Sequence, residues 1–77
     1  MSKAISSVSL IKVAHYDRVF YLIPRTGNTI TTSEQREMLR YIRSIGDDAF
    51  LVSDELYFSE EALFHLDMKY CDKYNFI

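Results

Sequence analysis

The chain has 77 residues, 48% of them hydrophobic and 14% aromatic, and a formal net charge of −2. This composition excludes a disordered chain, and the length suits a single domain covering residues 1–77. The one cysteine, Cys71, excludes a disulfide-stapled secreted domain, and no apolar run is long enough for a signal peptide or a membrane span, so we expect a cytoplasmic protein without membrane contact.

Two strand-like segments precede the first helix. Val8–Ala14 and Val19–Ile23 are rich in β-branched, aliphatic and aromatic residues, and His15–Arg18 between them is a turn candidate. Pro24 ends the second segment and begins a loop. Thr29–Thr31 at the end of that loop is predicted as a further short strand.

The best-specified element is a helix that begins near residue 33. Thr32 or Ser33 is a natural N-cap, and Thr32 with Gln35 fits a capping box. Gly46 fits the position that follows a helix C-terminus. Apolar side chains at helical spacing form one predicted core-facing arc, comprising Met38, Leu39, Ile42 and Ile45.

The second half repeats the order of strands and helix. Ala49–Val52 and Leu56–Phe58 are predicted strands joined by a tight hairpin, and Ser59 caps a second helix that we expect to run to about Tyr74. The predicted order is therefore ββαββα. It indicates an α+β fold in which an antiparallel sheet carries two helices mainly on one face.

The strands Val19–Ile23 and Ala49–Val52 lack the alternation of apolar and polar residues that is typical of a sheet with one wet face. Every residue in both is apolar or aromatic, so both sides of these strands are expected to be covered. Two helices cover only one side of a small sheet. The pattern therefore favours a partner on the other side.

The second predicted helix carries two apolar strips. The first comprises Leu63, Leu66, Tyr70 and Tyr74, and the second comprises Phe64, Met68 and Cys71. One strip suffices to pack on the sheet, which leaves the second for an interface, although a deeply buried helix would place both strips in the core. For the interface reading, we expect Met68→Asp to weaken association and leave the monomer folded.

Three arginines, Arg36, Arg40 and Arg43, lie opposite the apolar arc of the first helix, and Arg25 precedes it. Such a stripe suits a solvated helix surface, an acidic protein partner or a phosphate backbone. Glu37 lies three residues before Arg40 and offsets its charge. The chain also lacks the signatures of the common nucleic-acid-binding modules, so a solvated surface is the simplest interpretation.

Charge is divided unevenly along the chain. Residues 1–46 hold seven Lys or Arg against three acids, a net +4, whereas residues 47–77 hold two against eight, a net −6. This asymmetry suits a charged partner or contact between copies, unless folding mixes the charges. The only histidines, His15 and His65, have no local spacing to Cys71 that suits metal binding, so we expect neither a cofactor nor enzymatic activity.

These features lead to three hypotheses. The first is a non-enzymatic protein-binding module that regulates or inhibits a larger protein by occupying its surface; in size and composition it is analogous to phage inhibitors of host enzymes or defence systems. Its predicted partner-binding residues are Phe64, Met68, Cys71, Arg36, Arg40 and Arg43, with homodimerisation expected. The alternative is a dimeric nucleic-acid-binding regulator that uses Arg25, Arg36, Arg40 and Arg43. The third is a purely structural oligomer.

Overall fold

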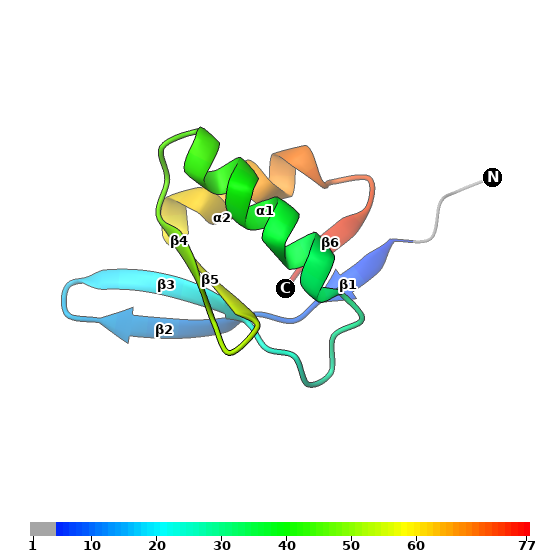
Figure 1. Ribbon diagram of the computed structural model, residues 1–77, viewed down its shortest axis with the longest axis horizontal. Helices are drawn as coiled ribbons and strands as arrows, with labels where there is room; N and C mark the ends of the chain where they lie inside the picture. Colours follow the sequence, from blue (N-terminus) through cyan, green and yellow to red (C-terminus); the bar gives the residue numbers. More distant parts are fainter. Residues whose placement is uncertain (1–4) are drawn as a thin grey trace.

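The computed structural model describes residues 5–77, whose elements follow the order βββαββαβ. These are β1 (Ser6–Val8), β2 (Ile11–His15), β3 (Arg18–Ile23), α1 (Thr32–Ser44), β4 (Ala49–Val52), β5 (Glu55–Ser59), α2 (Glu60–Lys69) and β6 (Tyr74–Phe76). A four-stranded antiparallel sheet has the order β2-β3-β5-β4, and both helices lie on one side of it (Figure 1). The predicted α+β class and the placement of the helices are confirmed.

Two tight hairpins build the sheet. In the first, His15 pairs with Arg18 around a two-residue loop whose first member, Tyr16, has a φ of +57°. In the second, Ser53 and Asp54 both have positive φ, the loop conformation that matches the twist of paired strands. Both turns lie where the sequence predicts them.

The N-terminus of α1 differs from the prediction by one residue. Thr31 is the N-cap, and Glu34 completes the capping box in place of Gln35. A charged carboxylate accepts a stronger hydrogen bond from the cap N–H than an amide does. The Gln35 side chain turns into the core instead, where it is 2% exposed, whereas Ile45 at the other end of the predicted arc is 41% exposed.

The second helix is shorter than predicted, because α2 ends at Lys69 and not near Tyr74. Residues 70–73 form a turn in which the Lys73 and Tyr74 N–H groups both donate to the Tyr70 carbonyl. The chain then forms β6, which pairs in parallel with β1 and buries the Tyr74 ring. After Lys69, the pairing of β6 with β1 and the burial of Tyr74 stabilise the chain more than further turns of helix would.

The first predicted strand is divided in two, and Thr29–Thr31 is not a strand. The division falls at Ser9, whose N–H donates to the Asn28 side chain and so leaves the sheet ladder. The Asn28 amide also donates to the Ser9 and Pro24 carbonyls, which fixes the loop before α1 as an irregular segment.

The core lies between the sheet and the helices. Its fully buried side chains come from both layers and include Ile23, Met38, Ile42, Leu56, Phe58 and Leu66. Neither helix in the described part of the chain has the length and apolar character that a bilayer crossing requires.

Candidate functional site: an apolar sheet face

The sheet register places a set of alternate residues on the side that carries no helix. Leu22 pairs with both Ile11 and Tyr57, Tyr57 pairs with Phe50, and residues two positions away point the same way. The apolar and aromatic residues on this side, which we call the sheet face, are Ile11, Val13, Phe20, Leu22, Phe50, Val52 and Tyr57. They account for the absence of alternation in β3 and β4. The same register places four polar residues at the ends of the strands on this side, namely His15, Arg18, Glu55 and Ser59.

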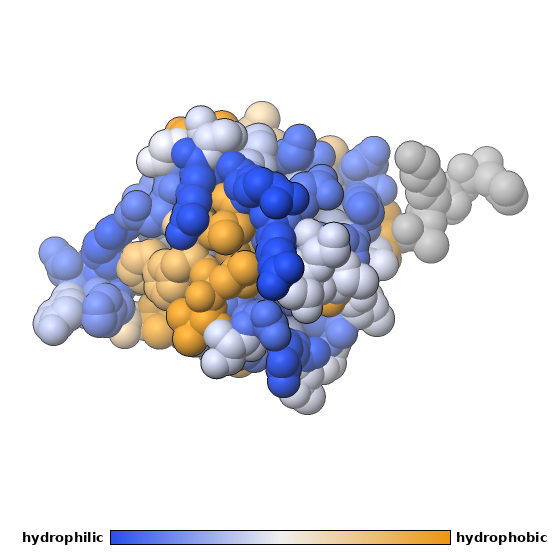
Figure 2. Space-filling model, in the orientation of Figure 1, coloured by the Kyte–Doolittle hydropathy of each residue, from blue (hydrophilic) through white to orange (hydrophobic). Residues whose placement is uncertain are grey.

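The sheet face is only partly covered by its own neighbours. Phe20 and Leu22 on the central strand β3 are 8% and 9% exposed, but Ile11, Phe50 and Val52 on the two edge strands are 48%, 39% and 48% exposed. Figure 2 shows hydrophobic surface over β4 and β5, bordered by hydrophilic side chains along α1. Exposed apolar surface of this kind is characteristic of interaction sites.

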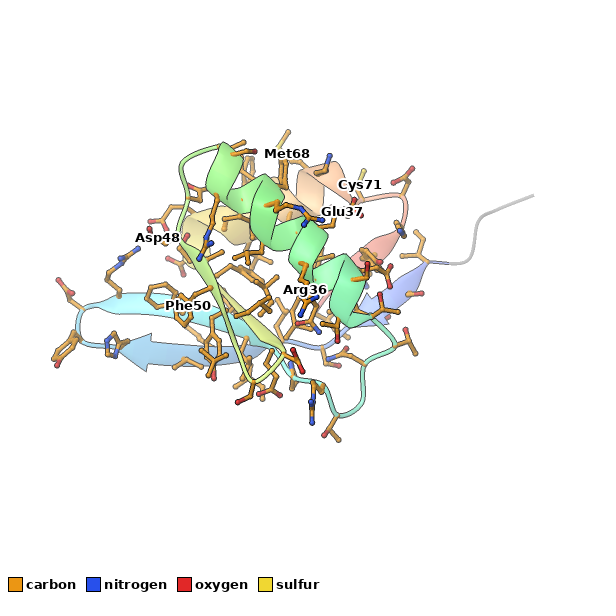
Figure 3. The ribbon with its side chains drawn as sticks, viewed as in Figure 1. Arg36, Glu37, Asp48, Phe50, Met68 and Cys71 are labelled. Atoms are coloured by element: carbon orange, nitrogen blue, oxygen red, sulfur yellow. The ribbon has the colours of Figure 1, made fainter. Side chains whose placement is uncertain are left out.

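Aromatic rings on the sheet face pack against one another and shape its surface. The rings of Phe50 and Tyr57 stack at 5.1 Å with an interplanar angle of 8°, and Phe20 meets Phe50 edge-on at 5.8 Å. Figure 3 shows Phe50 on the side of β4 away from α1. A depression of about 270 Å³ is lined by these three rings together with Val13 and His15. Such pre-positioned rings contact a partner at little entropic cost.

Charged groups at the rim are paired within the chain. Arg18 donates to Asp48 at 2.6 Å, a hydrogen bond that raises the pKa of the Arg18 guanidinium, which also lies 4.9 Å above the Phe20 ring. At the opposite end, the Arg25 guanidinium lies 3.8 Å from Asp54, and the Arg25 backbone N–H donates to the Glu55 carboxylate. Two rim arginines are thus paired with carboxylates of the chain, whereas Glu55 keeps its negative charge.

The predicted strip on α2 is exposed, but it is shorter than the sequence suggested. Phe64 and Met68 are 65% and 63% exposed on the side of α2 opposite the buried Ala62 and Leu66. Cys71 is exposed too, but it lies in the turn after the helix. A groove of about 400 Å³ runs between α2 and β6, lined by Glu60, Leu63, Phe64, Asp67, Asn75 and Phe76.

The arginine stripe is less uniform than its spacing suggests. All three side chains on α1 are exposed, but the Arg43 Nε donates to the Ala49 carbonyl on β4 at 3.2 Å. Arg25 in the preceding loop lies 3.8 Å from Asp54. Within residues 5–77 only Arg36 and Arg40 remain without an ion pair or hydrogen bond from the guanidinium group.

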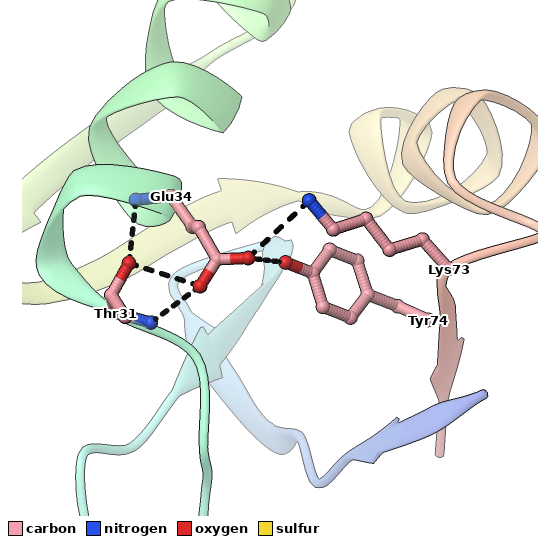
Figure 4. Close-up of polar contacts among 4 residues, drawn as sticks. All are labelled: Thr31, Glu34, Lys73 and Tyr74. Atoms are coloured by element: carbon pink, nitrogen blue, oxygen red, sulfur yellow. Dashed lines mark hydrogen bonds and ion pairs between the residues drawn. The ribbon is translucent and has the colours of Figure 1, made fainter. Parts of the chain in front are cut away.

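A polar network missed by the sequence analysis ties α1 to β6 (Figure 4). The Tyr74 hydroxyl donates to the Glu34 carboxylate, which also accepts from the Thr31 N–H and lies 3.5 Å from the Lys73 ammonium. These contacts lower the pKa of Glu34 to about 2, with the Tyr74 hydrogen bond as the largest cause and the Thr31 backbone hydrogen bond as the next. Burial, and then the bond to Glu34, raises the pKa of Tyr74. The spacing of Thr31 and Glu34 was the available signal for the helix cap.

One further contact between titratable groups joins α2 to the loop after α1. His65 Nδ1 lies 2.8 Å from the Asp47 carboxylate, on the solvent-accessible flank of α2. Across residues 5–77, no group of three or more His, Cys, Asp or Glu side chains is arranged to hold a metal ion.

The predicted partner residues do not form one surface. Phe64 and Met68 are on the outer side of α2, Cys71 is in the turn after it, and the three arginines are on α1. The sheet face contains none of the residues predicted individually. The missing alternation in β3 and β4 was the signal for this surface, but it could not indicate which alternate residues face away from the helices.

Searches against family models, curated proteins and solved structures found no match to this chain.

Proposed function

We propose that this domain is a non-enzymatic protein-binding module that regulates or inhibits a larger protein by occupying its surface. The observation that carries the proposal is the apolar sheet face. Ile11, Phe50 and Val52 expose between 39% and 48% of their surface around the stacked Phe50 and Tyr57 rings. Burying such a surface in an interface gains hydrophobic free energy in proportion to the area removed from water.

Phe50 and Phe64 provide a matched pair for the test, because both are exposed phenylalanines on different surfaces of the domain. We expect the immobilised wild-type chain to retain a specific protein from lysate of the source cells. Phe50→Glu would lose that protein, since a charge in the centre of the contact is costly to desolvate, whereas Phe64→Glu would retain it. Retention by Phe50→Glu together with loss by Phe64→Glu would move the docking surface to α2.

A second candidate function is a nucleic-acid-binding regulator, which is favoured by the two unpaired cations Arg36 and Arg40. The engagement of Arg43 with Ala49 and the proximity of Arg25 to Asp54 reduce the predicted set of four. If phosphate contacts carried binding, Arg40→Ala would reduce the salt dependence of the binding constant by about one counterion. Absence of DNA and RNA binding at low salt would eliminate this candidate.

A further inference from the structure

The two edges of the four-stranded sheet differ in how their backbone groups are satisfied. At the β4 edge, the Ala49 carbonyl accepts a hydrogen bond from Arg43 of α1. At the β2 edge, the residue pairing is set by the hairpin: the pair His15 and Arg18 closes a two-residue loop, so alternate residues of β2 bond to β3. Lys12 and Ala14 therefore direct their N–H and C=O groups outward, and no group within residues 5–77 bonds to them.

The sheet face is also small for a stable docking surface. Four strands at about 4.8 Å and five residues at about 3.4 Å span roughly 320 Å². A typical stable interface buries about 800 Å² on each partner. The flat footprint of one copy is therefore smaller than one side of a standard interface, and a second copy beside it would double that footprint.

We propose that two copies of this chain pair through β2 in an antiparallel arrangement, forming a continuous eight-stranded sheet with one enlarged apolar side. The β2–β3 hairpin extends beyond the layer of helices, which leaves the outer edge of β2 accessible (Figure 1). This inference rests on the proposed function, because the partner would dock on the joined sheet faces of both copies.

The sequence of β2 selects one register for the pairing. A two-fold axis at Val13 sets Lys12 opposite Ala14 of the second copy, so that the outward groups of these residues exchange four hydrogen bonds. All five residues of β2 are paired in this register. A shift that centres the axis on Lys12 sets two ammonium groups opposite each other, which is unfavourable. A centre at Ala14 forces Tyr16, in its positive-φ turn, into the ladder.

The same register makes the apolar surface continuous. Val13 and Ile11 belong to the sheet face, and in the pair they adjoin Val13 and His15 of the second copy on the same side of the joined sheet. The combined side spans about 640 Å², which is close to the roughly 800 Å² that a standard interface buries on each partner. The site for a larger partner is thus incomplete without the second copy.

Cysteine cross-linking tests the register directly. In a Cys71→Ser background, which removes the exposed native thiol, Val13→Cys places two thiols across a non-hydrogen-bonded pair with Cα atoms about 4.5 Å apart. That separation lies within the range of disulfides. We expect mild oxidation to link this variant into a dimer. The matched control is Ala14→Cys, which we expect to stay monomeric. In this register residue 14 of one copy faces Lys12 of the other, so the two introduced cysteines are too far apart along the strands to form a disulfide.

Sedimentation equilibrium of the purified chain provides the second measurement. We expect a reversible monomer–dimer equilibrium that Ala14→Pro weakens at least tenfold, since proline removes an outward N–H, while Ala14→Val preserves it. A monomer at all accessible concentrations overturns the inference, as does a dimer whose Val13→Cys variant does not cross-link. Partner capture is measured separately on the same preparations. A monomer that still captures a partner through Phe50 overturns the dimer and leaves the proposed function, whereas a dimer that captures nothing overturns the proposed function and leaves the dimer.

Discussion

The two sides of the sheet have similar compositions and opposite environments. Beneath the helices, Ile23, Leu56 and Phe58 are fully buried. On the sheet face, on the other side of the same backbone, Phe50 and Val52 remain 39% and 48% exposed. Apolar side chains are thus present in excess of what the two-layer fold covers. In the proposed function, the covered side supplies stability and the sheet face supplies contact with a partner.

Phe58→Ala is expected to have the largest effect. Its ring is 0% exposed on the central strand β5, and truncation of a buried phenylalanine costs about 3–5 kcal/mol of unfolding free energy. A chain of this length is expected to have only about 4–12 kcal/mol in total. Urea denaturation followed by circular dichroism would measure the loss. The control is Phe50→Ala on the sheet face, for which we expect a loss of about 1 kcal/mol; equal losses would show that the two sides contribute alike.

Tyr74→Phe is expected to have the next largest effect, because it removes the hydroxyl that donates to the Glu34 carboxylate. Hydrogen bonds to charged groups contribute about 1.5–3 kcal/mol, and the loss would appear in the same denaturation experiment. Tyr57→Phe is the matched control on the sheet face, where the hydroxyl has no hydrogen-bond partner within residues 5–77. A destabilisation by Tyr57→Phe of similar size would contradict this assignment.

The same network predicts a pH dependence. The pKa of Glu34 is lowered to about 2 in the fold, from its usual value of 4.5. The stabilisation is therefore fully present above pH 4.5 and is lost as the pH falls through about 2. The stability difference between wild type and Tyr74→Phe should shrink over this interval in denaturation curves. A constant difference from pH 7 to pH 2 would show that Glu34 ionisation does not stabilise the fold.

Local sequence signals predicted much of the fold. The hairpin around Ser53 and Asp54, the Ser59 cap and Gly46 after α1 all depend on residues within a few positions, and all three are confirmed. Two of the errors, at Tyr74 and at residues 8–10, lie where contacts with a distant part of the chain decide the outcome. The parallel pairing of β1 with β6 has no local signature, because its partners are separated by almost the whole chain.

The sequence predicted that one apolar side of the sheet is left uncovered, but not which residues lie on it. The unbroken apolar sequences of β3 and β4 indicated that some side of the sheet lacks cover, but the identity of the exposed residues depends on register. Phe50 and Tyr57 meet only because β4 pairs with β5 at that offset. Exposure of Phe64 and Met68, in contrast, follows from their position opposite Ala62 and Leu66 on one helix.

Met68→Asp is expected to have the smallest effect of the three substitutions. Met68 is 63% exposed, and substitutions at such positions usually change the unfolding free energy by no more than about 0.5 kcal/mol. We expect the monomer to stay folded and partner capture to weaken less than it does for Phe50→Glu, because α2 lies on the opposite side of the fold from the sheet face. Denaturation and quantitative capture on the same preparations would compare the two variants.

The comparison with Phe50→Glu decides between the two exposed apolar surfaces. Met68 and Phe64 follow each other on α2 beside the groove to β6, so an interface on this side would be disrupted by a charge at either position. Loss of capture in Met68→Asp, with capture preserved in Phe50→Glu, would assign docking to α2 and overturn the proposed docking on the sheet face. Unfolding of Met68→Asp would contradict its placement on the surface, since an aspartate in water has no desolvation cost.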